Sequence, residues 1–88
     1  MNITLPTSHL NGTGAKTIFD ENLEAMHAIC DALAVIEKME FNARDYYPQG
    51  PEAYTAARAE RNTHVEALRK AKEHFMAIAL HAQEFIKD

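Results

Sequence analysis

The sequence predicts an all-α fold, an antiparallel two-helix hairpin with an irregular N-terminal arm. Two long segments, residues 14–40 and 51–86, repeat apolar residues at helical spacing. The ten residues between them, 41–50, carry Pro48 and Gly50 ahead of Pro51, a composition typical of a chain reversal. With 88 residues, 47% hydrophobic and 25% charged, the chain has the composition of one small globular domain.

The arm comprises residues 1–13, MNITLPTSHLNGT, which are rich in turn-forming residues. The two helical segments differ in length, at about 40 Å and about 54 Å for a rise of 1.5 Å per residue. We therefore expect the end of the second helix, near Phe85 and Ile86, to project past the start of the first. Ile3, Leu5 and Leu10 of the arm are the local candidates to cover that end, and a second subunit is the other candidate. The sequence leaves open whether the arm packs on its own second helix or swaps to a neighbouring chain.

The first helix is predicted over residues 14–40. Its apolar residues recur at steps of three and four: Ile18, Phe19, Leu23, Met26, Ile29, Cys30, Leu33, Ile36 and Met39. Thr17, followed by Asp20 three residues later, is a weak capping box, and Thr13 is the competing N-cap. Cys30 lies on the apolar stripe, where a free cysteine usually packs as a small hydrophobe.

The second helix is predicted over residues 51–86 and begins at Pro51, because a missing N–H costs nothing at the first helical position. Its stripe is Tyr54, Ala57, Arg61, Val65, Leu68, Phe75, Ile78, Ala82, Phe85 and Ile86. A repeat of this length favours left-handed bundle or coiled-coil packing. Residues 15–40 carry six acids and two bases, and residues 51–88 carry six of each, so we expect the facing helices to attract.

The sequence also predicts self-association. An elongated chain of this size buries too little surface to be stable alone, and two helices enclose only one stripe each. A lone cysteine excludes an internal disulfide framework and fits a reducing cytosol. The sequence therefore predicts a homodimer with a four-helix bundle, and it leaves a tetramer open.

The connection carries the predicted interaction tip: Asn42, Arg44, Asp45, Tyr46, Tyr47 and Gln49. Tyrosine and arginine are typical anchors of protein interfaces. The alternative is that Tyr46 or Tyr47 folds back onto the end of the hairpin while Arg44 and Asp45 pair locally.

A basic cluster in the second helix supplies candidate nucleic-acid contacts: Arg58, Arg61, Arg69, Lys70 and Lys72. Glu60, Glu66 and Glu73 interleave it at salt-bridge spacings. An ion-pair face is therefore the default interpretation, and nucleic-acid binding is the alternative function.

Enzyme chemistry is not expected. Glu24 and His27 form one Glu-x-x-His motif, whereas a four-helix di-iron site needs two such motifs and two more glutamates. No catalytic residue and no cofactor is predicted, and Glu24 and His27 remain weak metal candidates. The longest apolar run, Phe75 to Leu80, is far shorter than the roughly 20 residues of a membrane span.

Two stretches, Ser8-His9-Leu10-Asn11-Gly12-Thr13 and Asn42-Ala43-Arg44-Asp45-Tyr46-Tyr47-Pro48-Gln49-Gly50, resemble small uncharacterised proteins of bacteriophages and prophages. The resemblance implies a bacterial cytoplasm or a virion and carries over no catalytic residue. The predicted function is protein–protein interaction or assembly as a homo-oligomer, with another phage or host protein as a further partner.

Overall fold

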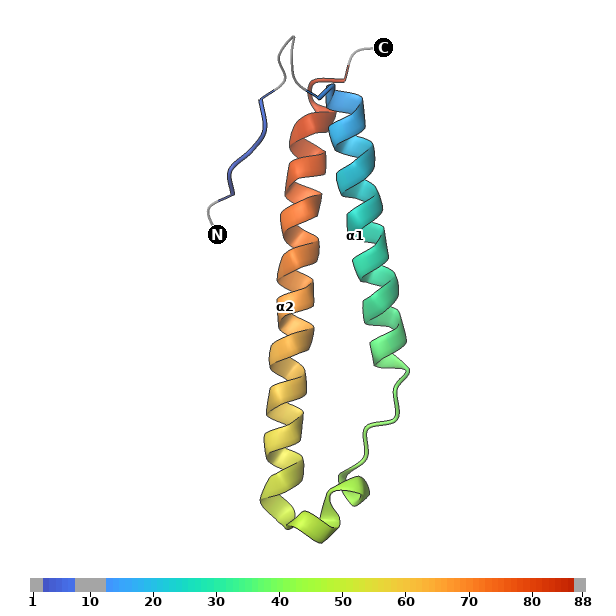
Figure 1. Cartoon of the computed structure of the whole chain (residues 1–88), viewed down its shortest axis with the longest axis vertical. Helices are drawn as coiled ribbons and strands as arrows, with labels where there is room; N and C mark the ends of the chain where they lie inside the picture. Colours follow the sequence, from blue (N-terminus) through green and yellow to red (C-terminus); the bar gives the residue numbers. More distant parts are fainter. Residues whose placement is uncertain (1–2, 8–12, 87–88) are drawn as a thin grey trace.

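A computed structural model describes residues 3–7 and 13–86. It contains two long helices, α1 (Ala15–Glu37) and α2 (Pro51–Gln83), joined through two short 3-10 helices, η1 (Ala43–Asp45) and η2 (Tyr47–Gln49). The two long helices lie side by side and run antiparallel (Figure 1), which confirms the predicted all-α hairpin. The molecule is a rod of 62 × 24 × 17 Å.

Helix α1 begins one residue later than predicted and ends three residues earlier. Its N-cap is Gly14, with no side-chain cap hydrogen bond, so neither Thr13 nor Thr17 caps the helix. Because the first helical residue is Ala15, Thr17 already lies within the first turn. The helix ends at Glu37, three residues before the predicted end, where the N–H of Met39 donates to the carbonyl of Ile36 at 3.1 Å and tightens the last turn.

Helix α2 begins at Pro51, as predicted, and ends at Gln83, three residues before the predicted end. Its start is set by Gly50, which has φ 104° and ψ 163°. A side chain is strongly disfavoured in this region of backbone space, so glycine is the residue that suits it. The following proline also requires extended backbone at Gly50. Glycine and proline together turn the chain sharply into α2.

The register of the two helices differs from the expectation. Ile18 and Ile78 line one pocket near the start of α1, and the Arg61 side chain reaches the carbonyl of Ile36 near its end. The start of α1 is thus level with the end of α2, and the extra length of α2 lies at the connection (Figure 1). The prediction that the end of α2 projects past the start of α1 is therefore wrong. The difference in helix length is taken up at the connection, where residues 38–50 run along the first turns of α2.

The arm packs on its own chain. The carbonyl oxygen of Pro6 lies 3.2 Å from Nε2 of His81, at hydrogen-bonding distance. Residues 3–7 run beside the C-terminal part of α2 (Figure 1). Ile3 and Pro6 are half-buried there, and Leu5 is 43% exposed. Leu10 lies outside the described residues.

The hairpin has almost no enclosed core. Within residues 3–7 and 13–86, only Ala79 and Ala82 are fully buried. The larger apolar residues of both stripes are half-buried, except for Met39 and Phe85, which are exposed. Two helices can shield only the line along which they touch, so the outer half of each stripe faces solvent.

No salt bridge joins α1 to α2 in the part of the chain that the structure describes. Its two ion pairs lie within single helices, Lys16 with Asp20 at 2.8 Å and Glu66 with Arg69 at 3.7 Å. The predicted attraction between the helices is therefore not realised as ion pairing. Neither helix is long and apolar enough to cross a membrane, as judged over the described ranges.

Candidate functional site

The connection folds into an aromatic cluster. The ring of Phe41 lies 5.3 Å from that of Tyr54 and 6.0 Å from that of Tyr46, and the Tyr46 and Tyr54 rings are 6.2 Å apart. Centroids at these distances are those of favourable tilted aromatic packing. Tyr46 therefore folds back onto the hairpin and is half-buried, while Tyr47 points outward and is 69% exposed.

The remaining residues of the predicted tip divide between the two environments. Asn42 is half-buried, whereas Arg44, Asp45 and Gln49 are exposed. Neither of the ion pairs in the described part of the chain involves Arg44 or Asp45, so the alternative of a local pair between them is not realised. The tip that is available to another molecule consists of Arg44, Asp45, Tyr47 and Gln49.

Arg61 connects α1, the connection and α2. Its Nη2 donates to the carbonyl oxygen of Ile36 at 3.1 Å, and its guanidinium carbon lies 5.4 Å from the centroid of the Phe41 ring. The first contact adds a second donor to a carbonyl in the last turn of α1, which already accepts the N–H of Met39. The second is a cation–π contact. A cation is also favourable at the negative end of a helix dipole, so this arginine stabilises the end of α1.

An apolar cavity of about 430 Å³ opens beside Arg61, in the angle between the end of α1, the connection and α2. We call it the notch. Its lining residues are Ile36, Met39, Glu40, Phe41, Asp45, Tyr46, Arg61, His64, Val65 and Leu68. The notch could not be predicted from the sequence, because its walls come from three segments that only the register of the hairpin brings together.

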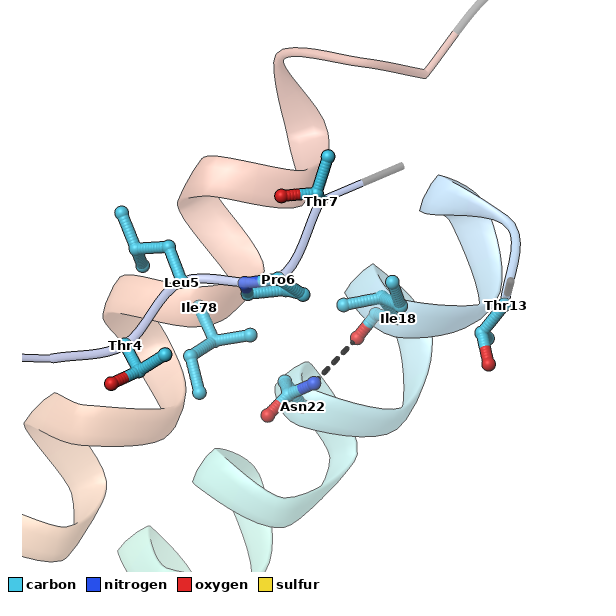
Figure 2. A pocket seen from close by; sticks show the side chains of 8 residues that line it. All are labelled: Thr4, Leu5, Pro6, Thr7, Thr13, Ile18, Asn22 and Ile78. Carbon is cyan, nitrogen blue, oxygen red and sulfur yellow. Dashed lines mark hydrogen bonds between the residues drawn. The ribbon is translucent and has the colours of Figure 1, made fainter. Parts of the chain in front are cut away.

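A second cavity, of about 550 Å³, lies under the arm (Figure 2). Leu5 and Pro6 pass over Ile78 of α2, and Ile18 and Asn22 of α1 face them across the groove. Nδ2 of Asn22 donates to the carbonyl oxygen of Ile18 at 2.8 Å, so its amide is engaged within α1. Thr4, Thr7 and Thr13 complete the lining.

A third hollow, of about 400 Å³, lies between α1 and α2 and includes Cys30, Ala34 and Arg69 in its lining. The Sγ of Cys30 lies 3.8 Å from the Sδ of Met26, one turn before it on α1. Cys30 is half-buried, which agrees with its place on the apolar stripe.

The two weak metal candidates, Glu24 and His27, are both exposed on α1. Within residues 3–7 and 13–86, no group of three or more His, Cys, Asp or Glu side chains lies close enough together to hold a metal ion. The His81 ring is occupied by its contact with Pro6 and packs edge-on against Phe85 at 5.2 Å.

Helical geometry places Arg58, Arg61, Arg69 and Lys72 on one side of α2, within about 80° of one another. Arg58, Arg69 and Lys70 are exposed, Arg61 and Lys72 are half-buried, and the Arg61 guanidinium is engaged by Ile36 and Phe41. Arg69 pairs with Glu66. Lys70 points about 100° away from Arg69 on the helix, as adjacent helical residues do. A phosphate backbone approaching α2 would therefore meet two exposed cations, Arg58 and Arg69, on one side of the helix and Lys70 on another.

Comparison with known proteins adds no assignment: no family model, no curated protein and no solved structure matches the chain.

Proposed function

We propose that this protein acts through protein–protein interaction as a self-associating helical hairpin, whose smallest assembly is a dimer with a four-helix core. The supporting observation is the amount of surface that the single chain leaves in solvent. The chain exposes 6898 Å². A compact monomer of the same mass exposes only about 5,200 Å².

The difference, about 1,700 Å² per chain, is comparable with the surface that homodimers hide. A standard interface takes about 800 Å² from each partner, and obligate homodimers bury about 2,000–5,000 Å² in total. Two hairpins that each lost this excess would fall within the obligate range. The rod shape supports the same interpretation, since a radius of gyration of 18.8 Å compares with about 12 Å for a compact chain of this length.

The surface that the single hairpin leaves in solvent includes large apolar side chains. Val35, Met39 and Phe85 are each more than half exposed. The inner stripes of α1 and α2 are half-buried along most of their length. A second hairpin laid against this one would cover apolar side chains that no element of the same chain reaches, and burial of apolar surface is the main driving force of such association.

The exposed part of the tip is the proposed contact for a further partner. Arg44 and Tyr47 are exposed residues of η1 and η2, which lie at one end of the rod (Figure 1). The resemblance of this stretch to phage and prophage proteins gives a phage or host protein as that partner, in a bacterial cytoplasm or a virion.

Absolute mass in solution tests the core of the proposal. Light scattering across a hundredfold concentration range should give a mass at least twice the 9.9 kDa of the chain, with helical circular dichroism throughout. A chain that stays helical and monomeric at every concentration would overturn the proposal.

The tip is tested separately by affinity capture from a bacterial lysate. The double variant Arg44→Ala and Tyr47→Ala should keep its mass and helicity and lose a protein that the wild-type chain retains. Thr63→Ala, at an exposed position of α2 away from the tip, is the matched control. Equal capture by both variants, or no specific capture by the wild-type chain, would remove the role of the tip.

A further inference from the structure

The arm and the notch lie on the same side of the hairpin. Ile18 lines the arm pocket and Ile36 lines the notch. These residues are 18 positions apart on α1, about five full turns, so they project in the same direction. On α2, the corresponding residues Ile78 and His64 are within about 40° of each other by the same geometry. We call this side the arm face.

The arm face therefore carries a ridge near one end and a hollow near the other. The ridge is the arm, held at the level of His81 by the carbonyl of Pro6. The hollow is the notch, at the level of Val65. Sixteen residues of helix separate these two levels, a distance of about 24 Å. The third hollow shares Ile36, Arg61 and Val65 with the notch. It opens to the opposite side of the hairpin, where it is lined by Ala34, about 160° from Ile18 around α1.

Between the ridge and the notch, Glu21 of α1 and His74 of α2 lie on the arm face, about 60° from Ile18 and about 40° from Ile78. Beside them on this face are five small side chains. They are Ala25, Ala28 and Ala32 on α1 and Ala67 and Ala71 on α2. Each of them lies on the same side of its helix as Ile18 or Ile78. The distance between packed helices depends on the side chains at the contact, so this middle stretch permits a close approach of another helical surface.

We infer that a second copy of this chain docks on the arm face in antiparallel orientation, so that the arm of each copy fills the notch of the other. The inference rests on the self-association proposed above and adds its surface and its orientation. Two-fold pairing is isologous, so both arm-to-notch contacts form together. The axis crosses the rod midway between the two levels, near residues 73–74 of α2.

The ridge decides the orientation. In a parallel pair through this face, the two arms would meet at the same end and hold the alanine stretches apart. In the antiparallel pair each ridge lies over a hollow, and the faces can close along their length. The surplus of about 1,700 Å² per chain over a compact monomer is the surface from which such a contact would be drawn.

The chemistry of the arm fits the notch. Residues 3–7 are Ile-Thr-Leu-Pro-Thr, without a charged side chain, so they bring no charge that must be desolvated. Leu5 is 43% exposed and is the apolar group free to enter the cavity. The hydroxyls of Thr4 and Thr7 can donate to the carboxylates of Glu40 and Asp45 at the notch.

A disulfide between engineered cysteines tests the orientation directly. The variant combines Leu5→Cys and Met39→Cys in a Cys30→Ser background, and both introduced positions are exposed. Within one chain they lie about 20 Å apart along the rod, whereas a disulfide needs Cα atoms within about 7 Å. A bridge between positions 5 and 39 must therefore join two chains.

Oxidation should convert most of the protein into a covalent dimer, and mass spectrometry should find the 5–39 linked peptide. The Leu5→Cys variant alone should stay unbridged, because the two arms lie at opposite ends of an antiparallel pair. A 5–5 bridge would show parallel pairing and overturn the inference. Covalent dimers through Met76→Cys, on the opposite side of α2, would assign the contact to the other face.

A charge placed in the notch provides a second, independent measurement. Met39→Asp should raise the dimer dissociation constant at least tenfold. Leu80→Asp, an equally exposed position turned away from the arm face, should change it less than threefold. A dimer by light scattering without the 5–39 bridge would refute the inference and leave self-association intact. A helical monomer would refute both.

Discussion

Replacing Arg61 by methionine should destabilise the hairpin by about 2–3 kcal/mol, as worked from its two contacts. A hydrogen bond from a charged donor contributes about 1.5–3 kcal/mol. Here the lower end, about 1.5–2 kcal/mol, applies, because the Ile36 carbonyl that accepts it at 3.1 Å also accepts the N–H of Met39. A partly exposed cation–π contact adds about 0.5–1 kcal/mol, and the guanidinium lies 5.4 Å from the Phe41 ring. Methionine keeps the apolar stem of the side chain and removes the polar head, so the packing loss is small.

Thermal unfolding followed by circular dichroism measures this loss. One kcal/mol shifts the Tm of a domain of this size by about 4–8 °C, so we expect a fall of roughly 10–20 °C. All variants must be compared at one protomer concentration, because association raises the apparent stability. Arg69→Met is the matched control. Its pair with Glu66 is 3.7 Å long and more than half exposed, and such surface pairs contribute about 0.3–0.5 kcal/mol.

A double-mutant cycle with Phe41→Leu separates the two contacts of Arg61. The coupling between Arg61 and Phe41 should be about 0.5–1 kcal/mol. If Arg61→Met lowered the Tm no more than Arg69→Met does, the two contacts of Arg61 would not stabilise the hairpin as expected. A coupling of zero would remove the cation–π contribution and leave the hydrogen bond to Ile36 as the whole effect.

Three further substitutions test the backbone and the packing. Gly50→Ala should cost about 1–3 kcal/mol, because an alanine at φ 104° is strained. Gly14→Ala, at φ −63°, should cost less, because the penalty for alanine at an N-cap is offset by about 0.4–1 kcal/mol from the lower entropy of the unfolded chain; equal Tm values would contradict this. Ala79→Leu should cost about 1–3 kcal/mol by forcing the helices apart at a buried position, and Ala59→Leu, which is exposed, should be nearly neutral in the same unfolding assay. His81→Leu should free the arm and speed amide hydrogen exchange at residues 3–7 several-fold, and unchanged exchange would show that the arm is held by its apolar contacts alone.

The helices themselves could be predicted because their signal is local. An apolar residue at every third or fourth position specifies a helix whatever it packs against, and Pro51 marks the start of α2 through its own geometry. The ends at Glu37 and Gln83 were predicted three residues too late. Met39, Phe85 and Ile86 continue the apolar spacing beyond the helices, and the pattern alone does not show that the chain has already turned.

The sequence alone could not decide between the two hypotheses for the tip, an interaction surface or a tyrosine that folds back onto the hairpin. Tyr46 and Tyr47 are chemically identical neighbours in the sequence. The structure directs Tyr46 towards Phe41 and Tyr54 and leaves Tyr47 in solvent. Adjacent residues in a tight turn point in different directions, and which of them meets the hairpin depends on the position of α2.

The two helices, their antiparallel connection and the apolar stripe of each could be predicted from the order of the residues. These features follow from short-range periodicity and from the restricted geometry of glycine and proline. The register, the path of the arm along α2, the role of Arg61 and the notch became visible only in the folded chain. Each of these depends on contacts between residues far apart in the chain, such as Arg61 with Ile36 and His81 with Pro6. Sliding one helix past the other would leave the pattern of each helix unchanged while replacing every one of those contacts.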